Sequence, residues 1–193
     1  MSKRHPRNTP PRWIVTALGL DRPGIVAGVT KVLYQLGCNL EDSAMTRLEG
    51  EFAVMLIFSG PKSLTEAWIR KAFEPLAKRL TLAVHIKPLS QAETSAPSGK
   101  TRAYTISVYG ADRPGIVYNV STALAKLGVN ITDVHTHRSG SKTRRDATSL
   151  YLMVIQAETP PSLNMARLER SLETLRKTLG VEVSLHAADA AVL

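Results

Sequence analysis

The sequence contains little cysteine, few large aromatic residues and no long apolar run. Its single cysteine, Cys38, excludes an internal disulfide and a cysteine-based zinc site, and it fits a reducing compartment. No apolar stretch approaches the ~18–20 residues that span a bilayer. The basic residues 1–12 are not followed by the apolar segment of a secretory signal. These features predict a soluble, cytoplasmic protein that makes no contact with membranes.

Motifs of catalysis and cofactor binding are also missing. The sequence contains no Walker loop, no G-x-G-x-x-G segment and no H-E-x-x-H segment. His135 and His137 lie two positions apart and would face one side of a strand, but no third metal ligand accompanies them. We therefore predict no catalytic residue, no metal site and no cofactor, and we expect that the protein is not an enzyme.

The charge is strongly positive, with a formal net charge of +9. Basic residues gather in the N-terminal tail and around one later loop: Lys3, Arg4, Arg7, Arg12, Arg138, Lys142, Arg144 and Arg145. A solvated tail and a solvated hairpin tip account for both groups, and contact with DNA, RNA or an acidic protein surface is the alternative. Neither half carries a helix-turn-helix pattern, and the strands that would bind RNA are mainly aliphatic. Direct nucleic-acid binding is therefore the weaker prediction, and neither basic group is assigned a role.

One six-residue segment, DRPGIV, occurs twice, at residues 21–26 and 112–117. The same offset of 91 positions aligns the β-rich residues before the segment, the apolar stripe after it, and Asn39 with Asn130. Such a repeat predicts two copies of one module.

The register of the repeat shifts after a loop, residues 139–146, that the first half lacks. Beyond this loop we align EFAVMLIF, residues 51–58, with TSLYLMVI, residues 148–155. Insertions fall in surface turns, so the extra loop is predicted to form a hairpin tip.

A segment rich in Ser, Thr, Pro and Gly lies between the two copies and has the composition of a linker. The predicted organisation is a basic flexible tail (1–12), a first domain (13–88), a linker (89–101), a second domain (102–187) and a C-terminal tail (188–193).

Each half has the same predicted order of strands and helices. A β-rich run precedes the repeated segment, and an apolar stripe of helical spacing follows it and ends at Gly37 or Gly128. Two strands, a second helix with Ser63 or Ser162 as its expected N-cap, and a fourth strand complete the order βαββαβ. The fold class is therefore α+β: two ferredoxin-like domains in tandem, each an antiparallel four-stranded sheet with both helices on one face. The open face is partly apolar and invites a partner sheet or helix.

The repeated segment has a complete structural interpretation. Asp21 or Asp112 can accept a backbone N–H as an N-cap, and proline fits the first turn of a helix. Gly24 and Gly115 place no Cβ beside the backbone. The first strand would thus end, turn sharply and start a helix.

The same turn can also bind a ligand. A helix N-terminus exposes N–H groups and a partial positive charge, which favour a carboxylate. Asn39 and Asn130 begin the next strand, which we expect beside the end of the first strand. Their amide oxygens, together with the aspartates of the repeated segment, would then hold the ammonium group of an amino acid.

A strand, DRPGIV, a helix and LGCNLEDS in a βαββαβ order resemble the ACT domain, a small-molecule sensing module attached to many enzymes of amino-acid metabolism. The chain from about Trp13 to Ala187 resembles two such modules in tandem. Its first copy, VTALGLDRPGIV…GCNLEDSAMTRLEGEFAVMLIFSG, is similar to the glycine cleavage system transcriptional repressor group.

The resemblance implies ligand binding between paired modules, at the first strand-to-helix turn. Carried over to this chain, the ligand contacts are Asp21, Gly24, Ile25 and Asn39, and in the second copy Asp112, Gly115, Ile116 and Asn130. The implied function is a non-enzymatic regulator that senses glycine or a similar small amino acid and modulates a transcriptional activator by protein–protein contact. A homodimer formed through ACT–ACT contacts is compatible with it.

Two alternatives stay open at this point. The same site would serve an amino-acid-sensing regulatory subunit of a metabolic enzyme, and the positive charge would serve a nucleic-acid-binding protein. The sequence leaves the amino acid, the protein partner and the oligomeric state open.

Overall fold

The structure, a computed structural model, describes residues 10–90, 101–139 and 149–188. The predicted tail and linker fall largely outside these ranges, as do the basic residues 142–145 and almost all of the predicted C-terminal tail. The chain divides into two compact units, Met1–Ala96 and Pro97–Leu193.

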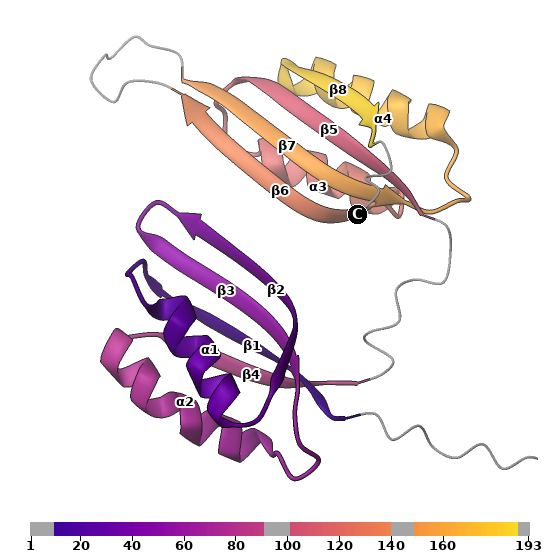
Figure 1. The fold of residues 1–193 in the computed structure, drawn as a ribbon. Coiled ribbons are helices and arrows are strands. Elements are labelled where there is room, and N and C mark those ends of the chain that lie inside the picture. Colours follow the sequence, from indigo (N-terminus) through magenta and orange to yellow (C-terminus); the bar gives the residue numbers. More distant parts are fainter. Residues whose placement is uncertain (1–9, 91–100, 140–148, 189–193) are drawn as a thin grey trace, which may run out of the picture. The chain divides into compact units, whose positions relative to one another are not determined.

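Both units have the predicted βαββαβ order (Figure 1). The elements of the first are β1 (Arg12–Leu20), α1 (Ile25–Gln35), β2 (Asn39–Leu48), β3 (Glu51–Ser59), α2 (Glu66–Leu80) and β4 (Ala83–Leu89). Those of the second are β5 (Arg102–Ala111), α3 (Ile116–Lys126), β6 (Asn130–Ser139), β7 (Leu150–Thr159), α4 (Met165–Leu179) and β8 (Val181–Ala187). The sheets are antiparallel, in the orders β2-β3-β1-β4 and β6-β7-β5-β8, and both helices of a unit lie on one face. The predicted fold class is confirmed.

The helices form where the apolar stripe predicts them. Ile25, Val29 and Leu33 of α1 are buried, and α3 repeats the pattern at positions 91 residues later. Full burial of such aliphatic side chains contributes about 1.5–3 kcal/mol each. Both helices end as predicted at a left-handed glycine, Gly37 with φ 69° and Gly128 with φ 70°.

The strands of the first unit alternate between a buried and an open face. On β1, Val15 and Ala17 are fully buried under the helices, whereas Thr16 is half-buried and Leu18 is exposed on the opposite face. This alternation confirms that one face of the sheet is uncovered and partly apolar.

The second helices begin two residues later than the sequence predicts. The N-caps are Thr65, which accepts from the Trp68 N–H at 3.3 Å, and Asn164, which accepts from the Ala166 N–H at 3.0 Å. The expected caps, Ser63 and Ser162, are wrong because a tight turn precedes each helix. In the first unit the Leu64 N–H donates to the Pro61 carbonyl at 2.9 Å, and the second unit repeats this bond.

The alignment of the third strands is also wrong, by two residues. Gly19 pairs with Phe52, and the equivalent Gly110 pairs with Tyr151. Phe52 therefore corresponds to Tyr151, an offset of 99 rather than the 97 of our alignment. A slip of two residues keeps every side chain on its own face of the sheet, so the apolar pattern cannot reveal it.

The turn from β1 into α1 depends on a glycine backbone rather than on a capping side chain. Gly24 is the N-cap, with φ 93° and ψ −3°, and Gly115 adopts the same angles before α3. In the described residues no side chain caps either helix, so the expectation that Asp21 and Asp112 are N-caps is wrong. The helix starts four residues after Asp21, and the proline stands before its first turn.

Among the residues that the structure describes, no helix combines the length and hydropathy of a membrane-spanning segment. Cys38 lies half-buried against the core of the first unit, and this burial raises the pKa of its thiol. The residue packs rather than presenting a reactive thiolate.

Thr65→Ala should lower the free energy of unfolding by about 1 kcal/mol, because the mutation removes the side chain that caps α2. Ser63→Ala is the matched control two residues away and should change stability by less than about 0.5 kcal/mol. Urea denaturation of both variants measures the difference. An equal loss for the two variants would contradict the assigned cap.

Gly24→Ala should lower the free energy of unfolding by about 1–2 kcal/mol, because a Cβ disfavours a positive φ. Apart from Gly24 and its two chain neighbours, no heavy atom of the described residues lies within 4 Å of the position that this Cβ would take, so the loss would come from backbone strain. Gly50 is equally open and is not among the positive-φ glycines of the described residues, so Gly50→Ala is the control. Thermal melting of both variants tests the strain, and an unchanged Gly24→Ala melting curve would refute it.

Candidate functional site

Each turn from first strand to first helix is tied to the second strand by an ion pair. Arg47 of β2 lies 3.4 Å from the Asp21 carboxylate, and Arg138 of β6 pairs with Asp112. Sequence reasoning missed both arginines as site residues. The signal was available, because each arginine follows its aspartate by 26 positions, as the 91-residue offset requires.

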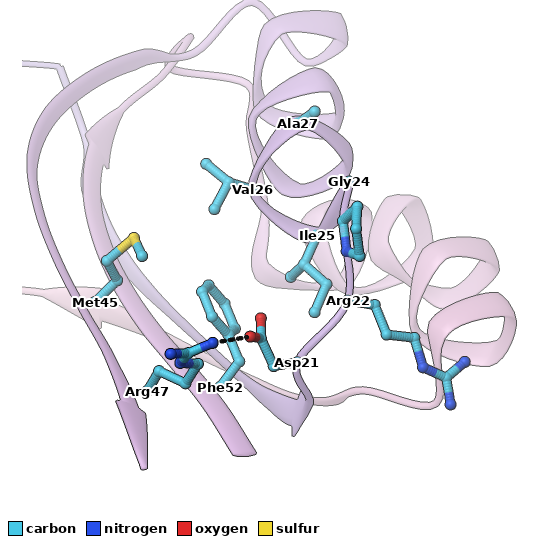
Figure 2. Close-up of a pocket in the computed structure, with 10 residues that line it drawn as sticks. Asp21, Arg22, Gly24, Ile25, Val26, Ala27, Met45, Arg47 and Phe52 are labelled. Atoms are coloured by element: carbon cyan, nitrogen blue, oxygen red, sulfur yellow. Dashed lines mark hydrogen bonds and ion pairs between the residues drawn. The ribbon is translucent and has the colours of Figure 1, made fainter. Parts of the chain in front are cut away.

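A hollow of about 710 Å³ opens between the start of α1 and the edge strand β2. Figure 2 shows Met45 and Arg47 from β2 and Phe52 from β3 on one side, with Ile25 and Val26 on the other. Its lining residues are Asp21, Arg22, Pro23, Gly24, Ile25, Val26, Ala27, Met45, Arg47 and Phe52. Of the predicted ligand contacts in this domain, the hollow therefore brings three together.

The second domain has a hollow in the same place, of about 370 Å³. Its lining residues are Asp112, Arg113, Gly115, Ile116, Val117, Tyr118 and Tyr151. Here too, three of the predicted ligand contacts share one cavity.

Asn39 and Asn130 lie elsewhere, so the expectation that they stand beside the turn is wrong. Asn39 pairs with Ser59, which in turn pairs with Arg12 at the beginning of β1, whereas the turn follows the end of β1. The cause is the strand order. β3 lies between β2 and β1 and is antiparallel to both, so β2 runs parallel to β1 and begins at the end of the sheet where β1 begins. The second sheet has the equivalent order, and it places Asn130 in the same way.

The hollow offers the charges that an α-amino acid requires. Arg47 presents a guanidinium to a carboxylate, and Asp21 presents a carboxylate to an ammonium group. The first intrahelical bond of α1 runs from the Gly28 N–H to the Gly24 carbonyl at 2.8 Å, so three earlier N–H groups have no partner within the helix. The side chain of Arg22 points away from this cluster (Figure 2).

The existing ion pair is no obstacle to a ligand. The side chains of Arg47 and Asp21 are 68% and 36% exposed, and exposed pairs contribute at most about 1 kcal/mol. A zwitterion that enters between the two side chains replaces their ion pair with two ion pairs, one to Arg47 and one to Asp21.

The described ranges contain no group of side chains that could hold a metal ion. No three His, Cys, Asp or Glu side chains converge there on one point. His135 instead lies 3.0 Å from the Asp133 carboxylate, and both side chains are exposed.

The family model of the ACT domain matches the chain twice, at residues 12–87 and 104–173. The glycine cleavage system transcriptional repressor of Escherichia coli is 27% identical over 187 residues, which cover 91% of this chain and 90% of the repressor. A crystal structure of an unknown protein from Galdieria sulphuraria has a TM-score of 0.77 at 27% identity and covers 94% of this chain and 100% of that one.

A crystal structure of a putative glycine cleavage system transcriptional repressor covers 93% of this chain and 98% of its own, with a TM-score of 0.65 at 24% identity. At that identity the likeness shows the fold. Taken with the two family matches and the relationship to the E. coli repressor, it leads to one conclusion: the chain belongs to the ACT-domain proteins and consists of two ACT domains in tandem.

Proposed function

We propose that this protein is a non-enzymatic regulator that binds glycine or a similar small amino acid at the two hollows and acts on a transcriptional regulator by protein–protein contact. The observation that carries the proposal is the Asp–Arg pair, which stands at the same place beside both helix starts. A regulatory, amino-acid-sensing role also agrees with the ACT domains and with the name of the E. coli relative.

The proposed binding mode uses each group of the hollow once. The ligand carboxylate accepts from Arg47 and from the free N–H groups at the start of α1, where the helix dipole also favours an anion. The ligand ammonium donates to Asp21. Gly24 keeps the backbone open on the ligand side, since nothing lies within 4 Å of the place of its absent Cβ. Asp112, Gly115 and Ile116 take the same roles in the second domain.

The coupling to a partner runs through the edge strand. Among the described strands β2 pairs with β3 alone, and all residues of β2 are exposed. A ligand bridging Asp21 and Arg47 would fix β2 relative to α1, and an exposed edge is a surface on which another chain docks. Asn39 and Asn130 begin β2 and β6, at the end of each sheet opposite to the turn. We therefore retain them as ligand contacts only in a site that another copy of this chain completes.

Arg47→Ala and Arg138→Ala should each weaken glycine binding at one hollow by about 10–100-fold, since a charge-assisted hydrogen bond contributes roughly 1.5–3 kcal/mol. Isothermal titration calorimetry of the full chain measures this, and the double variant should show no heat of binding. Arg22→Ala is the matched control: Arg22 is a lining residue, but its side chain points away from the Asp21–Arg47 pair.

Serine and alanine are to be titrated in parallel with glycine. Absence of binding by all three to the unmodified chain at millimolar concentration would end the sensor proposal. Equal weakening by Arg22→Ala and Arg47→Ala would instead indicate a general charge effect.

Any affinity for DNA should be independent of sequence and should collapse between 50 and 200 mM salt, because only the surplus of positive charge would supply it. Gel-shift measurements on the full chain and on a chain lacking residues 1–12 test this expectation. A salt-resistant complex with one DNA sequence would favour the nucleic-acid-binding alternative over the sensor.

A further inference from the structure

The two hollows share the part of their lining that carries charge and shapes the turn. Seven positions in and around each hollow keep their residue type across the repeat: Asp21 and Asp112, Arg22 and Arg113, Pro23 and Pro114, Gly24 and Gly115, Ile25 and Ile116, Val26 and Val117, Arg47 and Arg138. These residues present the same ion pair and the same helix start in both domains. They therefore offer the same contacts to the carboxylate and ammonium groups that all α-amino acids share.

The remaining positions differ, and they differ in one direction. Small or apolar residues of the first domain correspond to residues with a hydroxyl or amide group in the second: Ala27 to Tyr118, Gly28 to Asn119, Met45 to Thr136, and Phe52 to Tyr151. Two of these pairs, Ala27 with Tyr118 and Phe52 with Tyr151, line both hollows, so the lining changes while the turn and its ion pair stay the same.

In the first domain the floor of the hollow is apolar. Phe52 is 3% exposed and carries no polar atom, and Met45 and Val26 flank the opening with exposed side chains. A ligand hydroxyl that entered here would lose its water without gaining a hydrogen bond. An aliphatic side chain would be favoured by burial.

In the second domain the residue that corresponds to Phe52 carries a hydroxyl group. Tyr151 lines the hollow and is 7% exposed, and its hydroxyl lies 3.8 Å from the Met153 sulfur, a weak acceptor. Thr136 of β6 pairs with Met153 in the same sheet. Burial and the charge of Asp112 both raise the pKa of this phenol, which keeps it a neutral donor.

The amide of Asn119 adds a further polar group at the start of α3. Its Nδ2 donates to the Gly115 carbonyl at 2.8 Å and lies 3.2 Å from the place that a Cβ of Gly115 would take. The equivalent space beside Gly24 is empty. The second hollow is also the smaller of the two, at about 370 Å³ against about 710 Å³.

We propose that the two hollows bind amino acids of different side-chain class: the first domain selects an aliphatic side chain, and the second a side chain with a hydroxyl group. Phe52 with Met45, and Tyr151 with Thr136, determine this specificity. The inference rests on the proposed function, since it assigns side-chain selection to a site already proposed to bind amino acids.

Valine and threonine are the sharpest probes, because they have nearly the same shape and differ by a methyl group against a hydroxyl group. Each hollow is observed alone in the full chain by disabling the other, with Arg47→Ala to observe the second domain and Arg138→Ala to observe the first. Calorimetry should give a valine preference of about tenfold at the first hollow and a threonine preference of about tenfold at the second, roughly one net hydrogen bond. Glycine has no side chain and should bind both with similar affinity.

Two variants then test the residues in question. Tyr151→Phe in the Arg47→Ala background should remove most of the threonine preference and leave glycine binding unchanged. Thr136→Val is the second test. Thr136 is exposed on β6, and valine is nearly isosteric with threonine, so we expect this variant to fold normally. Phe52→Tyr in the Arg138→Ala background should shift the first hollow toward threonine.

The outcomes separate the two proposals. A valine-to-threonine ratio that is the same at both hollows, or that Tyr151→Phe and Thr136→Val leave unchanged, overturns the specificity inference while glycine binding still supports the sensor. Failure of glycine, valine and threonine to bind the unmodified chain overturns both.

Discussion

The reversal from first strand to first helix is the constraint on which each domain depends. Four residues must end β1 at one end of the sheet and start α1 back across the buried face of the sheet. Gly24 and Gly115 make this possible with a φ of 93°, which a residue with a Cβ adopts only under strain. The position of α1 then decides which side chains it buries, and Ile25, Val29 and Leu33 follow from it.

The same reversal leaves the helix start uncapped and therefore available. A side-chain cap would occupy the free N–H groups of the first turn, whereas here the aspartate of the turn reaches across to the second strand. A structural need for a tight turn thus produces a polar hollow between a helix and an exposed edge strand. That arrangement suits a sensor, because a ligand in the hollow contacts an element that another protein can reach.

Duplication gives this protein two such hollows, each built on the same turn and the same ion pair. The residues that hold the turn and its ion pair are the same in both copies, and the residues around them have changed. This pattern is expected when backbone geometry and charge serve a common part of the ligands while the surrounding side chains adapt separately. Under the proposed function, such a tandem protein would respond to two signals with one fold.

Local pattern in the sequence determined most of the fold. The helical stripe, the left-handed glycines after each α1-type helix and the βαββαβ order all depend on residues near one another in the chain, so they could be predicted from it. The tertiary structure alone decided three further points: the place of Asn39, the caps of the second helices and the match of Phe52 with Tyr151. Strand order separates Asn39 from the turn, and the apolar periodicity of a strand does not reveal its neighbours in the sheet. A slip of two residues leaves every side chain on its own face, so the periodicity does not reveal the slip either. Arg47 and Arg138 lie between these cases, because the repeat offset marks them in the sequence but only the pairing of β2 with β3 brings them to the turn.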